Sequence, residues 1–323
     1  MSKYIEDITR DDLLQEPIRK GFGKGLLAAG QANEHVVAAC ADLTESTQMH
    51  LFKEAFESRF IEIGVAEQNL ATVGSGLAAM GKIPFISSYA AFSPGRNWEQ
   101  IRTTICLNDQ PVKIVGSHAG VSVGPDGATH QMLEDIALMR ALPNMVVIAP
   151  CDSIEAEKAT IAMAADKRPN YIRVAREASP VFTTKDAPFA IGKAYVFNEG
   201  NDITIIGTGS MTYIALKASH ELRAKGIAAE VIHCPTIKPL DAVTILGSVK
   251  KTGAVITVEE HQITGGLGGA IAELISEHHP VMMKRIGLMD RFGESGKPEE
   301  LYKHFGLTAE NISVAAQALC RVK

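Results

Sequence analysis

The chain has 323 residues, of which 46% are hydrophobic and 21% are charged, so it is long enough for two globular domains with separate cores. Its formal net charge of -5 and the lack of a basic run argue against binding to nucleic acid or to a membrane surface. No stretch of about 18 apolar residues could span a membrane, and no apolar signal core follows the N-terminus, so we expect a cytoplasmic protein.

The five cysteines are far apart in the sequence and odd in number. None stands in a Cys-x-x-Cys spacing, which argues against a disulfide framework and against a zinc ribbon. We interpret all of them as small buried hydrophobic residues: Cys40, Cys106, Cys151, Cys234 and Cys320.

Helix-like and strand-like segments alternate through the first half of the chain. The segment 36–41 is apolar throughout, and such a strand is usually covered on both faces, as in a parallel sheet between helices. The alternation predicts a doubly wound α/β domain. The expected helices are 17–31, 47–56, 66–80, 97–107, 133–141 and one from 153, and the expected strands are 36–41, 60–63, 84–88, 112–117, 145–149 and 171–174.

The periodicity lapses between residues 177 and 193, where Ser-Pro, Thr-Thr-Lys-Asp and Ala-Pro replace any regular pattern. We interpret this stretch as a linker. The alternation then resumes, which predicts a second, smaller sheet of the same class and a division into residues 1–190 and 191–323. The expected strands there are 202–206, 228–232 and 254–258, and the expected helices are 211–225, 240–249 and 267–278.

Glu67 stands where a short apolar strand ends, after Gly64, and a helix begins. The helix that follows carries mostly small residues, and a helix without long polar side chains is typical of one surrounded by protein. An acid at the mouth of such a helix is desolvated, which raises the pKa of its carboxyl group. The alternative is that Glu67 only complements the positive end of the helix dipole.

A long loop, 118–129, follows the fourth expected strand. Ligands of open α/β sheets bind outside the carboxyl ends of the strands, and loops of this length in a compact domain are usually functional. His118, Asp126 and, just beyond the loop, His130 can exchange protons or hold a ligand. A zinc site is one alternative, although no tight ligand spacing is present, and surface histidines without a role are another.

Two motifs resemble a known family. The segment 64–69, Gly-Val-Ala-Glu-Gln-Asn, is similar to the motif around the cofactor-activating glutamate in thiamine diphosphate enzymes of the transketolase group. The segment 124–131, Gly-Pro-Asp-Gly-Ala-Thr-His-Gln, resembles a run shared by transketolases and deoxyxylulose phosphate synthases. The likeness covers nearly the whole chain. It implies the C-terminal half of a transketolase encoded alone, with a pyrimidine-binding domain followed by a transketolase-type C-terminal domain.

The resemblance implies roles for individual residues. Glu67 would bind the pyrimidine ring of thiamine diphosphate and act in catalysis with His130 and Asp126, which would handle the hydroxyl groups of the substrate. Aromatic side chains suit a flat pyrimidine, and arginine suits a phosphate. The other cofactor contacts would be Tyr89, Phe92, Asp42 and Leu43, and the sugar phosphate would be held by His118, Arg176, Ser46 and Arg19.

The sequence also departs from the family. Transketolases usually carry Arg-Glu-His where this chain has Ala66-Glu67-Gln68, and a third aromatic residue of the family falls at Gly95. The Gly-Asp-Gly segment and asparagine that hold the diphosphate and its metal are not found, because Pro125 interrupts the candidate segment. We therefore expect that this chain has no metal site of its own. An N-terminal transketolase subunit would carry the site for the diphosphate of thiamine diphosphate and most of the contacts to Mg²⁺ or Ca²⁺, in a heterotetramer around a two-fold axis.

Two motifs of the second half are interpreted structurally. Gly207-Thr208-Gly209 lacks the third glycine of a dinucleotide fingerprint and predicts a tight turn. The segment 259–262, Glu-Glu-His-Gln, which precedes the glycines of 265–269, is interpreted as turn and interface.

Three alternatives to a transketolase subunit stay open. One is a deoxyxylulose-phosphate-synthase-like subunit, and another is the beta subunit of a 2-oxo acid dehydrogenase, whose family lacks the 124–131 motif. The third is a non-catalytic scaffold chain, against which the intact Glu67, Asp126 and His130 argue.

Overall fold

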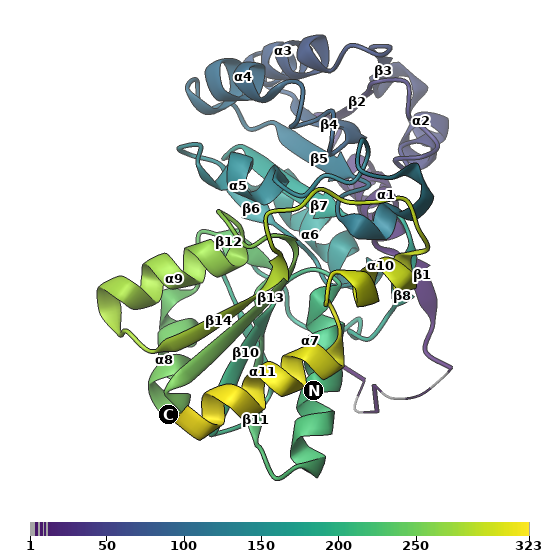
Figure 1. The fold of residues 1–323 in the computed structure, drawn as a ribbon. Coiled ribbons are helices and arrows are strands. Elements are labelled where there is room, and N and C mark those ends of the chain that lie inside the picture. The colour runs from purple at the N-terminus through teal and green to yellow at the C-terminus, as the bar shows by residue number, and fades with distance from the viewer. Residues whose placement is uncertain (1–3, 6, 9, 11, 323) are drawn as a thin grey trace.

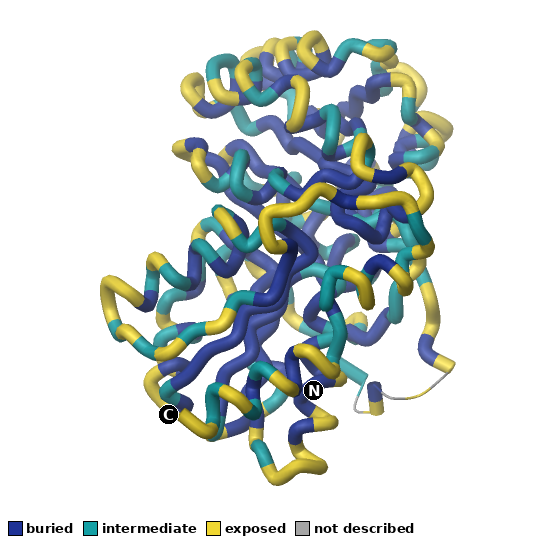
Figure 2. Tube along the Cα trace, viewed as in Figure 1, coloured by how far each residue is buried: buried dark blue, intermediate teal, exposed yellow. Residues whose placement is uncertain are grey.

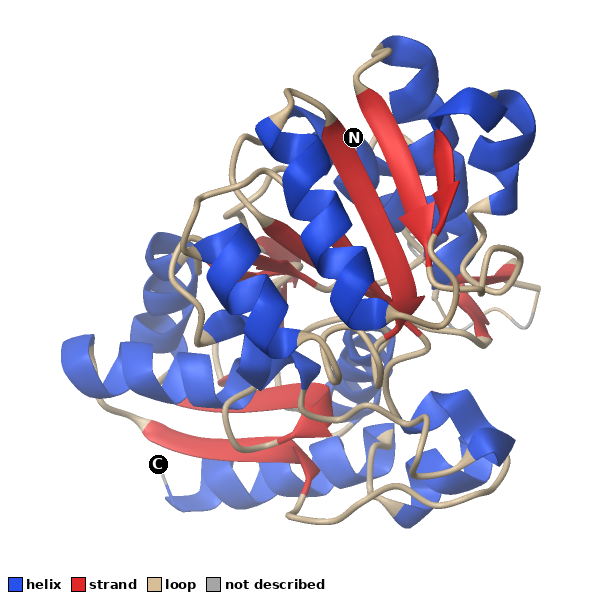
Figure 3. Cartoon of the chain, turned by 90° about the horizontal axis from the view of Figure 1, so that it is seen from above, coloured by secondary structure: helices blue, strands red, loops and turns tan. Residues whose placement is uncertain are grey.

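The computed structural model describes residues 4–5, 7–8, 10 and 12–322. Within them the chain forms two mainly parallel sheets flanked by helices, with a short two-stranded sheet beside them (Figures 1 and 3). The predicted α/β class with two doubly wound sheets is confirmed. The central strands of both larger sheets are buried, and the outer helix faces are exposed (Figure 2). None of the described helices is long and apolar enough to cross a membrane.

The first sheet has seven strands in the order β12-β6-β7-β5-β4-β2-β3, and all neighbours are parallel except β12 and β6. Its strands are β2 Val36–Cys40, β3 Phe60–Glu62, β4 Ile83–Tyr89, β5 Lys113–Ser117, β6 Val146–Ile148, β7 Asn170–Val174 and β12 Thr236–Lys238. Its helices are α1 Ile18–Ala32, α2 His50–Ala55, α3 Glu67–Ala79, α4 Trp98–Gln100, α5 Asp135–Arg140 and α6 Ser153–Ala165.

Three shorter helical segments modify the predicted pattern. A 3₁₀ turn, Glu57–Arg59, separates α2 from β3, and α4 continues as a π-helical segment, Ile101–Cys106. The predicted long loop contains a 3₁₀ segment, Val121–Asp126, broken at Gly124, whose φ is 79°. The loop is therefore more ordered than its sequence indicates.

The second sheet has five strands in the order β14-β13-β10-β11-β9, of which only β9 is antiparallel to its neighbour. Its strands are β9 Tyr195–Asn198, β10 Ile203–Gly207, β11 Ala229–His233, β13 Ala254–Gln262 and β14 Met282–Leu288. Its helices are α7 Met211–Ala224, α8 Ala242–Thr252, α9 Leu267–His278, α10 Pro298–His304 and α11 Ala309–Val322. Strands β9 and β14 and helices α10 and α11 were not predicted from the sequence.

Part of the predicted linker is structured. Strand β8, Ala178–Pro180, pairs in antiparallel register with β1, Gln15–Pro17. The stretch interpreted as a linker, 177–193, thus contains a short strand that its sequence did not indicate. Strands of three residues that contain proline have no readable period, and only their pairing partner defines them.

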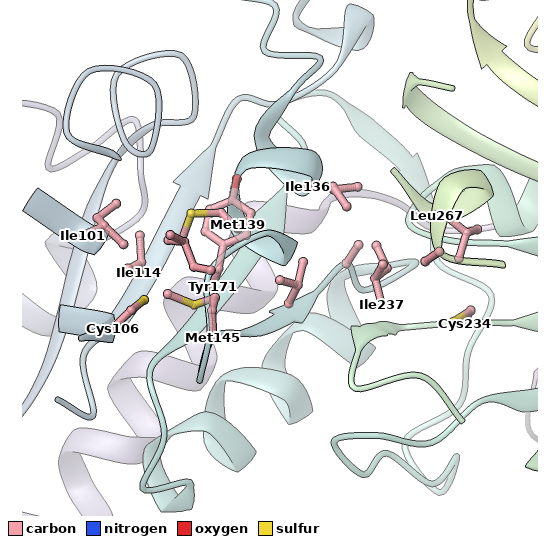
Figure 4. Packing of buried hydrophobic residues seen from close by; sticks show 14 of the residues in the cluster. Ile101, Cys106, Ile114, Ile136, Met139, Met145, Tyr171, Cys234, Ile237 and Leu267 are labelled. Atoms are coloured by element: carbon pink, nitrogen blue, oxygen red, sulfur yellow. The ribbon is translucent and has the colours of Figure 1, made fainter. Parts of the chain in front are cut away.

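The two sheets are joined through shared elements. Strand β12 follows β11 in sequence but pairs with β6 at the edge of the first sheet. One hydrophobic cluster continues from Ile114, Met139 and Tyr171 to Ile237 and Leu267 (Figure 4). The two sheets therefore share a continuous core, and the boundary between residues 190 and 191 stays a prediction.

Candidate active site

Glu67 is the first residue of α3, directly beyond β3, and it is 2% exposed. Its Oε1 accepts a hydrogen bond from Ser88 Oγ at 3.0 Å, and its backbone carbonyl accepts one from Asn97 Nδ2 at 2.8 Å. Its Oε2 is buried and has no hydrogen-bond partner among the described residues. The carboxylate is thus held through one oxygen, and its other oxygen has no partner in the part of the chain that the structure describes.

Four rings gather at the carboxyl ends of β4 and β5. The rings of Tyr89 and Phe92 are stacked with centroids 6.1 Å apart, and His118 stacks on Tyr89 at 3.8 Å. The edge of His130 meets Tyr89 at 6.1 Å and Phe92 at 5.5 Å. Ser88, which binds Glu67, directly precedes Tyr89, so the carboxylate and the ring cluster lie at the same end of β4.

His118 is buried with a φ of 57°, and its Nδ1 lies 2.8 Å from Ser117 Oγ. Burial, together with the positive charges of Arg19 and Arg176, lowers the pKa of His118 to about 3. The imidazole is therefore neutral at physiological pH and acts as a hydrogen-bonding group rather than as a cation.

Both candidate phosphate-binding arginines lie in the same network. Arg176 Nη1 lies 3.1 Å from Asp126 Oδ2 and donates to the carbonyl of Val123 at 3.1 Å. Arg19 donates to the carbonyls of Ser46 and Arg176. Burial, followed by the charge of Arg176, lowers the pKa of Arg19. The two guanidinium groups are thus oriented by the backbone before any substrate binds.

Asp42 and Leu43 lie elsewhere at the same edge of the sheet. Asp42 is exposed with a φ of 58°, and its N–H donates to Glu62 Oε1 at 2.7 Å. Leu43 is half-buried and packs against the hydrophobic cluster under β2. The interactions found for this pair are with Glu62 and the core rather than with the four rings.

Two family models match the chain. Residues 16–181 match the model described as transketolase, pyrimidine binding domain, and residues 192–312 match the model described as transketolase, C-terminal domain. The chain belongs to the transketolase family. The predicted resemblance to the C-terminal half of a transketolase is confirmed.

Relatives of similar length support the assignment. The chain is 45% identical, over 92% of its length and 94% of the relative, to a Methanocaldococcus jannaschii protein named, provisionally, a transketolase C-terminal section. It is 40% identical, over 92% of both chains, to a 6-deoxy-6-sulfo-D-fructose transketolase subunit of Clostridium sp.. A solved structure described as a split gene transketolase, inactive beta4 tetramer, matches with a TM-score of 0.89 and 43% identity over 95% of this chain and 99% of that one.

The structure of this transketolase chain corrects the interpretation of residues 259–262. They form the buried end of β13 rather than a turn. Glu259 accepts hydrogen bonds from the N–H groups of Leu267 and Gly268 at the start of α9. Glu260 accepts one from the N–H of Ser122, in the loop that carries Asp126. Sequence spacing gave no sign of these contacts.

The burial predicted for α3 is only partly correct. Glu67, Leu70 and Gly74 are buried, but Gln68, Thr72 and Gly76 on the opposite face are exposed. The small residues therefore leave one face of the helix open in the isolated transketolase chain.

The alternative of a zinc site at His118, Asp126 and His130 is not supported. Among the described residues, these three are not a group whose ligand atoms converge closely enough to hold a metal ion. The His, Cys, Asp and Glu atoms that converge within 4.8 Å belong to Cys151, Glu155 and His233. There Glu155 Oε2 lies 2.7 Å from His233 Nε2, which links the first sheet region to β11. Cys151 is buried, in line with its interpretation as a small buried hydrophobic residue, but it also lies beside this hydrogen-bonded pair. The other cysteines fit that interpretation, with Cys320 only partly buried.

A cavity of about 410 Å³ lies between the two sheet regions, behind the Asp126 loop. Ser122, Cys151, Ser210 and Tyr302 line it, together with residues of β8. Glu67, Tyr89 and His130 are not part of its lining, so this cavity is separate from the candidate active site.

Proposed function

We propose that this chain is the C-terminal subunit of a split transketolase, which transfers a two-carbon ketol unit between sugar phosphates with thiamine diphosphate. The observation that carries the proposal is the buried carboxylate of Glu67, at the same end of β4 as the stacked rings of Tyr89 and Phe92. Its Oε2 lacks a partner within the described residues, and such a group costs free energy until a ligand supplies a donor. A pyrimidine ring with a protonated nitrogen fits this oxygen, and the aromatic pair fits the face of the ring.

Glu67 would then share a proton with the pyrimidine nitrogen, while Ser88 keeps the carboxylate in place. Thiamine diphosphate, when bound, supplies the carbon that carries the ketol unit. The interaction with Asn97 fixes the backbone of Glu67, so the carboxylate keeps its position during proton exchange. Asp42 and Leu43 would contact the cofactor at the outer edge of the site.

The remaining residues would hold the sugar phosphate. Arg176 and Arg19, which are oriented by backbone carbonyls, suit the phosphate, and Ser46 lies against Arg19. Neutral His118 would add a hydrogen bond. His130 and Asp126 would bind hydroxyl groups of the sugar and exchange protons with them.

The diphosphate end needs a second polypeptide. The segment 124–127 is the nearest resemblance to a Gly-Asp-Gly site, but Asp126 is bound to Arg176 and the carbonyl of Gly124 accepts a hydrogen bond from Gln131. An N-terminal transketolase subunit would supply the diphosphate site with Mg²⁺ or Ca²⁺. Relatives named as subunits of sulfofructose and apulose-4-phosphate transketolases support a two-chain enzyme. The open face of α3 suits association with a second copy of this chain.

The test combines the purified chain with an N-terminal transketolase subunit from the same source. Ketol transfer from a phosphorylated ketose to a phosphorylated aldose is measured with thiamine diphosphate and Mg²⁺. We expect activity from the mixture and none from either chain alone. Pyruvate-dependent condensation would instead indicate a deoxyxylulose-phosphate-synthase-like subunit. A stable but inactive complex would favour a scaffold chain and overturn the proposal.

A calorimetric measurement checks the split site directly. The chain alone should bind thiamine diphosphate weakly, because it grips only the pyrimidine end. Tight, magnesium-dependent binding to the chain by itself would contradict the need for a partner.

A further inference from the structure

The long loop and the two residues after it, together 118–131, carry His118, Asp126 and His130. Residues from the second half of the chain hold this extended loop. The carboxylate of Glu260, on β13, accepts a hydrogen bond from the N–H of Ser122 at 2.6 Å. It also accepts one from the hydroxyl of Tyr302, on α10, at 3.2 Å. Glu260 is 3% exposed, so the loop is fastened to a buried anchor of the second sheet.

The surroundings of Glu260 indicate that it holds the loop by a hydrogen bond to its carboxyl oxygen, and that this bond does not require the group to be charged. Burial raises the pKa of Glu260, and the guanidinium of Arg173 opposes that shift. Arg173 donates to the carbonyl of Glu260 at 2.7 Å and pairs with Asp135 at 2.9 Å. A carboxyl oxygen accepts the Ser122 N–H whether or not the group is ionised.

A second attachment comes from Gln131 at the other end of the loop. Its side-chain amide donates to the carbonyls of Val121 at 3.2 Å and Gly124 at 3.0 Å, inside the loop. It also donates at 2.9 Å to the carbonyl of Glu294. Glu294 lies in the segment between β14 and α10, which crosses toward the first sheet (Figure 1).

Two glycines allow the close approach at these attachments. Gly120 has a φ of 92°, and a Cβ there would lie 2.3 Å from Glu260 Oε1. At Gly293 a Cβ would lie 1.7 Å from Gln131 Oε1. The backbone therefore contacts both anchoring side chains directly, and little space is left for the loop to shift.

We propose that the second sheet region sets the working conformation of the loop 118–131, with Glu260 and Gln131 as positioning residues for the transfer reaction. This inference rests on the proposed function only for its catalytic consequence. Displacing a substrate-positioning group by about 1 Å lowers the rate by roughly a hundredfold. The second sheet region, which contributes none of the proposed substrate-binding residues, would thus control how well those residues are aligned.

The structural part is tested on the chain alone by hydrogen exchange of the loop amides. In Glu260→Ala the N–H of Ser122 loses its acceptor, so we expect faster exchange within 119–131 and unchanged exchange in β4 and β5. Glu230→Ala is the matched control, because Glu230 is a buried carboxylate of the same sheet that pairs with Lys251. It should leave exchange of the loop unchanged.

The catalytic part is tested with the two-subunit enzyme. Glu260→Ala should lower kcat/KM by about tenfold to a hundredfold, for phosphorylated and unphosphorylated sugars alike, because the whole loop moves. Glu260→Gln keeps an acceptor oxygen and should restore kcat/KM to within about threefold of the wild type. Gln131→Ala removes the second attachment and should lower kcat/KM by a similar factor. This variant tests the same inference if Glu260→Ala folds poorly.

Several results would overturn the inference. Loop exchange in Glu260→Ala equal to that in Glu230→Ala would show that Glu260 does not hold the loop. An active wild-type complex in which Glu260→Ala and Gln131→Ala both keep normal kcat/KM would remove the catalytic consequence. If the wild-type complex itself shows no ketol transfer, the proposed function fails, while the exchange result still decides whether Glu260 positions the loop.

Discussion

Arg176 and Asp126, both assigned to the substrate, are bound to each other in the free chain, with Nη1 and Oδ2 3.1 Å apart. Their side chains are 31% and 36% exposed, and an ion pair that exposed contributes at most about 1 kcal/mol. A phosphate, which suits the guanidinium fork, can replace the carboxylate. Phosphate binding would then free the carboxylate of Asp126 to accept a hydrogen bond from a hydroxyl group of the sugar.

Arg176→Ala should therefore raise KM chiefly for phosphorylated sugars. A charge-assisted contact contributes about 1.5 to 3 kcal/mol, which corresponds to roughly tenfold or more. KM is compared for a phosphorylated sugar and its unphosphorylated counterpart, with Arg168→Ala as the control because Arg168 pairs with Asp166 outside the site. An equal loss for both sugars would show that Arg176 does not bind the phosphate.

Glu67→Gln should preserve the fold and remove most of the turnover. The amide has the same shape and Ser88 can still bind it, but it cannot exchange the proton that the pyrimidine requires. We expect kcat to fall by about 10²-fold to 10⁴-fold, with thermal unfolding of the chain unchanged. Glu99→Gln, on the exposed side of α4, is the control. A Glu67→Gln enzyme with near-normal kcat would show that Glu67 does not exchange a proton with the pyrimidine.

His118→Asn should reduce the sensitivity of the free chain to acid. The pKa of His118 is lowered to about 3 in the folded chain, whereas the unfolded chain takes up the proton near the ordinary histidine pKa of 6.5. Stability is therefore lost as pH falls from 6.5 toward 3, because only the unfolded state binds that proton. Urea unfolding at pH 7 and pH 4.5 measures the difference, with the exposed His35→Asn as control. An unchanged difference in His118→Asn would contradict the neutral imidazole.

The local part of the site could be predicted because its residues follow the ends of strands. Glu67 follows Gly64 at the end of β3, and Tyr89 ends β4, so the chain direction alone places them at one edge of the sheet. The two attachments of the loop could not be predicted in this way. Glu260 and Ser122 are 138 positions apart, and no periodicity connects them.

The elements missed by the sequence analysis share a similar cause. Strand β12 is defined by pairing with β6, although its neighbours in sequence belong to the second sheet. The small residues of α3 indicate a covered helix, but no other part of the described chain covers the open face of that helix. Such features depend on which surfaces meet in space, which a single sequence does not encode as a local pattern.

The open face of α3 gives a prediction about assembly. Gly76 is exposed there, and a Cβ at this position would meet no atom of residues 4–5, 7–8, 10 or 12–322 within 4 Å. Gly76→Arg should therefore fold normally alone, with a helix stabilised by up to about 1 kcal/mol because a helical glycine is replaced. If α3 packs closely against a second copy, the same side chain blocks that contact and lowers the mass of the assembly.

Gly247→Arg is the matched control, because Gly247 is also an exposed helical glycine without close neighbours, on α8 of the second sheet. Light scattering of each variant with the N-terminal subunit should give the full assembly for Gly247→Arg and a smaller one for Gly76→Arg. An arginine at position 76 could not fit between closely packed helices. A Gly76→Arg complex with the mass of the wild-type assembly would therefore show that the two copies do not meet at the open face of α3.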